Sequence, residues 1–225
     1  MKIIISPSKS MQFEDRYSTD VYPDESYKKI FKKLKVISKK NLGTAFGIKG
    51  NILDQTYYNI QNNDNLESNS AIRAYTGFVF KGLNLDLYSK EEWDYLNKNL
   101  IIISAYYGLL TPKTMIKPYR LDYKAKIGMD LYKYRKFSFE DTVVNLASEE
   151  FSKTVTSPMI TVGFKEQVKG KFINKPTYSK QARGVLLDYL IKNQVNKLDE
   201  IKCFSELDYR FNSDLSDETN IVFTR

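Results

Sequence analysis

Polar side chains follow three apolar runs of the sequence at the points where those runs end. Ile3-Ile4-Ile5 leads to a serine, residues 100–103 lead to a second serine, and residues 143–147 lead to a third. Nearly continuous apolar runs of this length are typical of parallel strands that are buried on both faces. In such sheets, ligands bind in the crevice outside the carboxyl ends of the strands. The sequence therefore predicts that these groups gather in a polar pocket at one edge of a sheet.

The side chains expected at this edge are mostly hydroxyls, with one amide and one lysine. They are Ser6, Ser8, Lys9, Ser104, Tyr106, Asn145 and Ser148. The segment 104–122 returns Tyr119 and Arg120 toward them after a turn at Pro118, and the planar guanidinium suits phosphate or carboxylate. The alternative interpretation is that the tyrosines of this segment only pack against the end of the sheet and that Arg120 pairs with a surface acid.

The composition removes several classes of chemistry. The chain has no histidine and one cysteine, Cys203, which excludes Ser-His-Asp and Cys-His catalysis, histidine metal sites and thiolate zinc sites. The carboxylates show no spacing that predicts metal ligands, so we predict neither a metal nor a cofactor. One cysteine permits no intrachain disulfide, which favours the reducing cytoplasm. No apolar run approaches the length of a membrane span, so no membrane partner is expected.

The charge of the chain points to anionic partners. Its 225 residues include 35 lysines and arginines against 27 aspartates and glutamates, a net charge of +8. The tail 205–225 holds five of the acids and two of the bases, so the rest of the chain carries +11 (33 bases against 22 acids). A basic body favours nucleic acid or nucleotides as partners. The alternative is that the lysines only confer solubility.

Hydrophobic patterning predicts the elements that position these groups. Strand-like segments are residues 2–6, 101–104, 143–148, 159–164, 170–173, 208–211 and 221–224. Helical periodicity marks residues 26–39, 89–97 and 179–193, the second of which opens with the capping box Ser89-Lys90-Glu91-Glu92. The polar stretch 59–70 is typical of a loop. Strands that alternate with helices around one core predict an α/β fold with a mixed sheet, in a single domain over residues 1–225.

A lysine-rich region within that domain, residues 28–60, is a second candidate site. Four lysines at helical spacing lie opposite an apolar face, and the connection Gly47-Ile48-Lys49-Gly50 precedes another apolar-patterned segment. This outline is typical of a helix-hairpin-helix element, in which backbone N–H groups and a helix N-terminus approach a phosphate. The DNA-binding candidates are Lys28, Lys32, Lys35, Lys39, Gly47, Lys49, Gly50 and Asn51. The alternative is an ordinary corner between two helices.

Several ordered motifs give the chain a resemblance to a known family. They are Ile5-Ser6-Pro7-Ser8-Lys9, Tyr107-Gly108-Leu109-Leu110-Thr111-Pro112, Pro118-Tyr119-Arg120-Leu121, Asn145-Leu146-Ala147-Ser148-Glu149-Glu150 and Lys180-Gln181-Ala182-Arg183-Gly184. With these motifs the chain resembles the YaaA family of peroxide stress proteins over nearly its whole length. The resemblance implies a compact α/β fold with a positively charged cleft and a helix-hairpin-helix element. It also implies binding of duplex DNA, distorted DNA included, and limitation of the oxidative damage that is linked to free iron.

The motifs and the resemblance together predict a cytoplasmic protein that protects against peroxide. Its expected partner is double-stranded DNA, including bent, bubbled or damaged forms, bound largely through backbone phosphates. The alternative is an enzyme that acts on a nucleobase, a nucleotide or another small anion in the pocket at the strand ends.

The motifs also extend the set of pocket candidates. The added residues are Tyr107, Glu149, Lys180 and Arg183. In this hypothesis Lys9, Arg120 and Arg183 hold the negative charge of the ligand, and a tyrosine stacks on a ring or donates a proton. Glu149, at a strand end, is the candidate base. Base flipping would join the pocket and the DNA-binding region in one mechanism, because chemistry on a base requires the base outside the stack.

Overall fold

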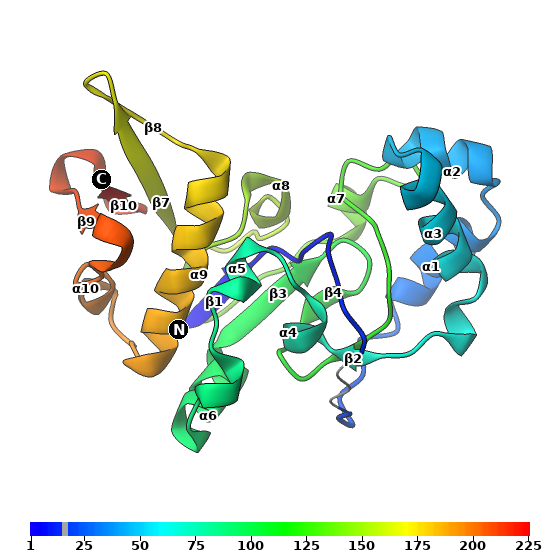
Figure 1. Ribbon diagram of the computed structural model, residues 1–225, viewed down its shortest axis with the longest axis horizontal. Coiled ribbons are helices and arrows are strands. Elements are labelled where there is room, and N and C mark those ends of the chain that lie inside the picture. Colours follow the sequence, from blue (N-terminus) through cyan, green and yellow to red (C-terminus); the bar gives the residue numbers. More distant parts are fainter. Residues whose placement is uncertain (15–17) are drawn as a thin grey trace.

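The sheet at the centre of the structure is mixed, and its middle strands run parallel (Figure 1). The computed structural model describes residues 1–14 and 18–225. Within these residues, the main sheet has the strand order β4-β3-β1-β6-β7-β10-β9, and β8 pairs with β7. Neighbouring strands from β3 to β10 are parallel, whereas β4, β8 and β9 pair antiparallel. The mixed α/β class predicted from the sequence is confirmed.

The strands are short except for one. They are β1 (Lys2–Ile5), β3 (Leu100–Ser104), β4 (Gly108–Leu110), β6 (Val143–Asn145), β7 (Met159–Val168), β8 (Lys171–Ile173), β9 (Arg210–Phe211) and β10 (Asn220–Thr224). A separate two-stranded ribbon is formed by β2 (Asn69–Ser70) and β5 (Met115–Ile116).

Helices surround the sheet, and three of them form a group at one end of the molecule (Figure 1). That group is α1 (Tyr27–Lys35), α2 (Lys39–Phe46) and α3 (Gly50–Gln61). The others are α4 (Ala71–Ala74), α5 (Phe78–Lys81), α6 (Lys90–Asn99), α7 (Leu131–Tyr134), α8 (Glu149–Ser152), α9 (Pro176–Lys192) and α10 (Leu198–Ile201). Across the described ranges, no helix combines the length and the apolar character that a membrane crossing requires.

The N-terminal strand β1 lies in the middle of the sheet because it is apolar on both faces. The side chains of Ile3, Ile4 and Ile5 are at most 1% exposed, so both faces of β1 are covered. Ile3 pairs with Leu100 of β3 on one side and with Val144 of β6 on the other, and both pairings are parallel. The three serine-terminated strands therefore end at the same edge of the sheet, as their sequence pattern predicts.

The predicted helix 26–39 is wrong only in its last four residues. α1 ends at Lys35, and a second helix, α2, begins after Ser38. Ser38 has an extended backbone, and its hydroxyl accepts a hydrogen bond from the N–H of Asn41, which is the geometry of a helix N-cap. Lys39 therefore lies in a different helix from the other predicted DNA-binding lysines of this region.

Other boundaries differ from the predictions for local reasons. α9 begins at Pro176 rather than Ser179, because proline is well suited to the first position of a helix. The strand predicted over residues 208–211 is limited to Arg210–Phe211, because Leu207 and Asp208 have φ of 54° and 62°. The predicted loop 59–70 begins only after Gln61, where α3 ends.

Two glycines allow α5 and α9 to cross in backbone contact. A Cβ atom on Gly184 of α9 would lie 2.4 Å from the carbonyl oxygen of Val79, and one on Gly82 would lie 2.5 Å from the carbonyl carbon of Gly184. No other residue fits at such a distance. The crossing holds residues 77–82 against the first half of α9, and both segments contribute side chains to the cavity described next.

Candidate functional site

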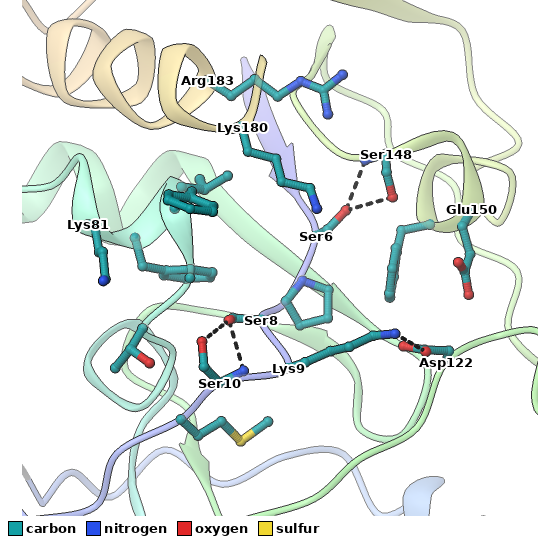
Figure 2. A pocket seen from close by; sticks show the side chains of 18 of the residues that line it. Ser6, Ser8, Lys9, Ser10, Lys81, Asp122, Ser148, Glu150, Lys180 and Arg183 are labelled. Carbon is teal, nitrogen blue, oxygen red and sulfur yellow. Dashed lines mark hydrogen bonds and ion pairs between the residues drawn. The ribbon is translucent and has the colours of Figure 1, made fainter. Parts of the chain in front are cut away.

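A cavity of about 640 Å³ lies at the carboxyl ends of β1 and β6, between these strands, α5 and α9 (Figure 2). Eight of the residues predicted for the pocket line it: Ser6, Ser8, Lys9, Tyr119, Arg120, Ser148, Lys180 and Arg183. They come from four separate stretches of the sequence. The parallel strands and the glycine crossing between α5 and α9 bring these stretches together.

Ser6 and Ser148 tie two strand ends together at the floor of the cavity. The hydroxyl of Ser6 accepts a hydrogen bond of 2.9 Å from the backbone N–H of Ser148, and the two hydroxyl oxygens are 3.3 Å apart. Within the described residues, no carboxylate or amine forms a hydrogen bond with either hydroxyl. An activated serine needs an adjacent base, so this pair supports positioning of a ligand rather than nucleophilic attack.

Cationic side chains outnumber acidic ones around the cavity. The bases that line it are Lys9, Lys81, Arg120, Lys180 and Arg183, and the acids are Asp122 and Glu150. Both acids already have partners, since Asp122 lies 2.7 Å from the ammonium of Lys9 and Glu150 accepts a hydrogen bond from the N–H of Tyr123. In the part of the chain that the structure describes, the other four bases have no ion-pair partner. Basic side chains without an ion-pair partner therefore outnumber such acids in the described lining of the cavity.

Arg183 is the most unusual of these bases. Its side chain extends from α9 toward the loops that hold Ser6 and Ser148 (Figure 2), and its Nε is buried without a hydrogen-bond partner among the described residues. Burial lowers the pKa of its guanidinium from the ordinary value, and no neighbouring carboxylate offsets that effect. A buried cation without a partner costs free energy, and an anion in the cavity would offset this cost.

Five predicted pocket residues do not line the cavity: Ser104, Tyr106, Tyr107, Asn145 and Glu149. Ser104 is fully buried, and its hydroxyl accepts hydrogen bonds from the N–H groups of Tyr106 and Tyr107. Asn145 is also buried and holds the N–H of Ala147 with its Oδ1. Tyr107 accepts a hydrogen bond from the N–H of Lys117. The side chains of these three residues accept hydrogen bonds from backbone N–H groups near the strand ends and do not face the cavity.

Glu149, the candidate base, points away from the cavity into solvent. It is the first residue of α8, and its carboxylate lies 2.7 Å from the ammonium of Lys153, one turn along the helix. That lysine holds the pKa of the carboxyl below its ordinary value. The next residue, Glu150, faces the cavity instead. The sequence contains both glutamates but does not show which of them the first turn of α8 directs inward.

The tyrosines of segment 104–122 mainly pack against one another. The ring centroid of Tyr106 lies 4.6 Å from that of Tyr107 and 5.2 Å from that of Tyr119. Tyr106 and Tyr107 are buried, whereas Tyr119 also lines the cavity and forms hydrogen bonds of 2.7 Å with Ser104 and Tyr75. The packing interpretation therefore applies to Tyr106 and Tyr107, and the pocket interpretation to Tyr119.

The tyrosine cluster makes the stability of the fold sensitive to alkaline pH. Burial raises the pKa of Tyr119 to about 12 from an ordinary 10.0, and it also raises the pKa of Tyr106 and of Tyr107. The unfolded chain loses these protons at a lower pH than the folded chain. We therefore expect Tyr119 alone to contribute about 2–3 kcal/mol that is fully present below pH 10 and lost as the pH rises to about 12.

Urea unfolding between pH 9 and 12 measures this loss. Tyr119→Phe is expected to reduce the dependence of the unfolding free energy on pH, whereas Tyr22→Phe, whose ring is 72% exposed, should leave it unchanged. An equal pH dependence in the wild type and Tyr119→Phe would contradict the expectation.

Three charged residues of the cavity were not predicted. Lys81 belongs to α5, a short helix that the sequence pattern did not reveal, although Gly77 and Gly82 bracket its apolar run. In the sequence, Asp122 lies two residues after the predicted Arg120, and Glu150 directly follows the predicted Glu149. The contacts of Asp122 with Lys9 and of Glu150 with Tyr123 depend on the tertiary structure.

The DNA-binding candidates lie in the α1–α3 group, and several of their cations are already engaged. Lys28 pairs with Glu25, and Lys39 lies 2.8 Å from Asp54. The ammonium of Lys35 donates to the carbonyl oxygen of Gln61 at 2.6 Å, so it caps the end of α3. Such exposed pairs are weak.

Lys32 and Lys49 are exposed and have no partner among the described residues. They are the two lysines of the predicted set that remain available to a ligand.

The connection between α2 and α3 is a tight turn with two left-handed glycines. Gly47 has a φ of 63° and Gly50 a φ of 58°, which glycine adopts without strain. Gly47 also ends α2 as its C-cap. Lys49 precedes α3, and no side chain caps the N–H groups of the first turn, where Gly50 and Asn51 are exposed. The predicted turn is present between two helices, and its role toward DNA remains a prediction.

Comparison with known proteins identifies the family of this chain. A family described as "Peroxide stress protein YaaA" matches residues 1–215. A UPF0246 protein of Fusobacterium nucleatum is 39% identical over 245 aligned residues, which cover 100% of this chain and 99% of that protein. A UPF0246 protein of Agathobacter rectalis is 32% identical over 100% of this chain and 99% of its own length. The chain therefore belongs to the YaaA family of peroxide stress proteins.

Proposed function

We propose that this peroxide stress protein binds a small phosphate-bearing anion, of the nucleotide class, in the cavity at the strand ends. The observation that carries the proposal is the unpartnered, partly buried guanidinium of Arg183 in a cavity where free cations outnumber free acids. Arginine presents a planar set of donors that matches the oxygens of a phosphate. Lys180, one turn before it on α9, would add a second positive charge.

The size and the lining of the cavity favour a nucleotide over a bare phosphate. Its volume, about 640 Å³, lies within the range of small-molecule sites. Apolar lining side chains, among them Met11, Phe78 and Phe80, offer contacts for a base or a sugar. Tyr119 adds an aromatic ring to the lining. The lining combines cationic with apolar side chains, and a nucleotide would contact both kinds.

Calorimetric titration tests this proposal directly. The wild-type protein is titrated with inorganic phosphate, with nucleoside monophosphates and with the corresponding nucleosides. We expect the monophosphates to bind more tightly than either phosphate or the nucleosides, because only they contact both the cationic and the apolar side chains of the lining. If none of these probes releases heat or raises the melting temperature, the proposed ligand class is wrong.

As a second candidate function, we propose that the α2–α3 turn binds the backbone of double-stranded DNA. The observation that favours it is the pair of left-handed glycines before the uncapped first turn of α3, beside the free ammonium of Lys49. Exposed N–H groups at a helix N-terminus are well suited to a phosphate. Such binding would be weakly sequence-specific, and it would place the protein on the molecule that peroxide damages.

Reversal of two lysines tests this second function. Lys32→Glu/Lys49→Glu is expected to weaken binding to a duplex oligonucleotide uniformly across sequences and to lower the salt slope by about 2, since each lysine accounts for about one phosphate contact. Fluorescence anisotropy over a series of salt concentrations measures both quantities. The control, Lys90→Glu/Lys98→Glu on the distant helix α6, has the same change in charge. Equal losses in the two variants would show that only net charge matters.

A further inference from the structure

The hairpin formed by β7 and β8 projects beyond the sheet. The last residue of β7 that pairs with β6 is Thr161, and the last that pairs with β10 is Lys165. From Glu166 onward, the only strand in register with it within the described residues is β8. Figure 1 shows this ribbon extending away from the rest of the molecule. We call residues 165–175 the projecting hairpin.

The projecting hairpin leaves the sheet at the edge that holds the cavity. β7 is parallel to β6, and β6 is parallel to β1, so their carboxyl ends lie at the same edge. The chain then passes from β8 directly into α9, whose Lys180 and Arg183 line the cavity. The hairpin therefore leads, within a few residues, into the helix whose Lys180 and Arg183 line the cavity.

The surface of the projecting hairpin is basic and partly apolar. It contains the lysines Lys165, Lys169, Lys171 and Lys175. Its one acid, Glu166, is already bound by Tyr209 and by the guanidinium of Arg225 at 3.0 Å. Phe172 and Ile173 are 36% and 43% exposed. The uncompensated charge of the hairpin is thus positive, and its apolar side chains face water.

The two faces of the hairpin carry the same combination of side chains. Phe172 pairs with Gln167 and so shares a face with Lys165, two residues earlier in β7. Ile173 shares the other face with Lys171. Lysines alone could serve only to prevent edge-to-edge aggregation. Exposed apolar side chains beside them have the opposite effect, so protection of an edge does not explain this surface.

The turn at the tip holds the two strands in a defined register. Lys169 has a φ of 50° and Gly170 a φ of 76°, the pattern of the two-residue turns that suit the twist of a hairpin. A two-stranded ribbon has little stability of its own. At its base, the N–H of Gln167 donates to the backbone oxygen of Arg225, which fixes the ribbon to the sheet. The tip is therefore positioned by the fold without contributing to the core.

A second exposed ring lies on the other face of the hairpin. Tyr178, in the first turn of α9, is 42% exposed. The guanidinium of Arg225 lies 5.2 Å from its ring centroid and binds Glu166, which pairs with Ile173, so Tyr178 lies on the face opposite Phe172. Each face therefore exposes an apolar or aromatic side chain beside cations, a combination that is typical of surfaces that bind single strands of nucleic acid.

We propose that the projecting hairpin binds single-stranded nucleic acid on its Phe172 face, with a base stacked on Phe172 and phosphates held by Lys165 and Lys169. A single strand fits better than a duplex, because its unpaired bases are free to stack on the ring. The inference rests on the proposed function in one respect, because the bound strand would lead toward the cavity and could place a terminal nucleotide in it.

Anisotropy of a labelled oligothymidylate of about 12 nucleotides tests the proposal on the full chain. Phe172→Ala is expected to weaken binding about tenfold, the loss of one stacked base. Lys165→Glu/Lys169→Glu should weaken it further and lower its salt slope by about 2. The matched controls are Leu87→Ala, whose side chain is 81% exposed elsewhere, and Lys90→Glu/Lys98→Glu. Unchanged binding by Phe172→Ala and the double lysine variant overturns the proposal.

A spectroscopic readout separates stacking from general attraction. In Phe172→Trp, the introduced indole should lose fluorescence when the oligothymidylate binds, while Trp93, the chain's one natural tryptophan, serves as the internal reference in the wild-type protein. Phosphatidylglycerol vesicles, tested in parallel, should quench it far less. Equal quenching by the vesicles would show a surface that binds any anionic surface and would overturn the assignment to nucleic acid.

The two proposals fail in distinguishable ways. If the cavity proposal is wrong, nucleoside monophosphates will not bind, yet the hairpin variants will still lose affinity for the oligothymidylate. If the hairpin proposal is wrong, these variants will bind the oligothymidylate like the wild type, whatever the result with monophosphates.

Discussion

Arg183→Gln is expected to weaken the binding of a nucleoside monophosphate by about 100-fold, because it removes two charge-assisted hydrogen bonds and a unit charge from a partly buried wall. The same change should leave the unfolding free energy of the ligand-free protein unchanged or slightly higher. The reason is that the wild-type guanidinium is held in the cavity without a carboxylate partner, and burial lowers its pKa. Affinity and stability are therefore expected to move in opposite directions.

Calorimetry with the monophosphate and urea unfolding of the ligand-free protein measure the two effects. Arg183→Lys keeps the charge and loses the planar donor set, so its affinity should fall between those of the wild type and Arg183→Gln. Arg210→Gln, which removes an exposed guanidinium outside the cavity, is the matched control. A large loss of stability in Arg183→Gln would contradict the interpretation, since it would show that the guanidinium supports the fold rather than a ligand.

Gly184→Ala is expected to lower the unfolding free energy by about 3 kcal/mol, through overpacking where two backbones touch. The added methyl group would lie 2.4 Å from the carbonyl oxygen of Val79, so α5 must move away from α9. Residues 77–81 carry one wall of the cavity, so the affinity for a monophosphate should fall together with the stability.

Urea unfolding measures the loss, and the cavity ligand reports the movement of α5. Gly163→Ala is the matched control, because a methyl group there would meet only Val222 at an ordinary 3.8 Å. If Gly184→Ala yields too little folded protein, Gly82→Ala tests the same contact from the other helix, with 2.5 Å to the carbonyl carbon of Gly184. Wild-type stability in both crossing variants would show that the two helices separate without cost.

The strand ends could be predicted because burial on both faces leaves a simple signature. Three consecutive isoleucines before Ser6 require cover on both sides, and this requirement places β1 among parallel neighbours. The glycine crossing could not be predicted, since nothing in the sequence shows that Gly82 and Gly184 meet. The inward turn of Glu150 instead of Glu149 depends on where α8 begins, which sequence patterns fix only to within a few residues.

The lysines show a second limit of sequence reasoning. Counting them predicts a basic flank, but pairing decides which of them are free. Lys35 caps the end of α3 and Lys39 pairs with Asp54 from the next helix, so two regularly spaced lysines have structural partners. A helical spacing of lysines predicts where their ammonium groups could lie. It does not predict which carbonyl groups and carboxylates the tertiary structure brings next to them.

The central position of β1 has a consequence for how the chain is made. β1 leaves the ribosome before both of its partners, and the earlier of these, Leu100–Ser104, follows about a hundred residues later. At about 5–20 residues per second, the wait lasts about 5–20 seconds. During that time a strand of three isoleucines has no native neighbour and is available to any unpaired edge nearby. Synthesis of this protein should therefore depend on chaperones that shelter β1.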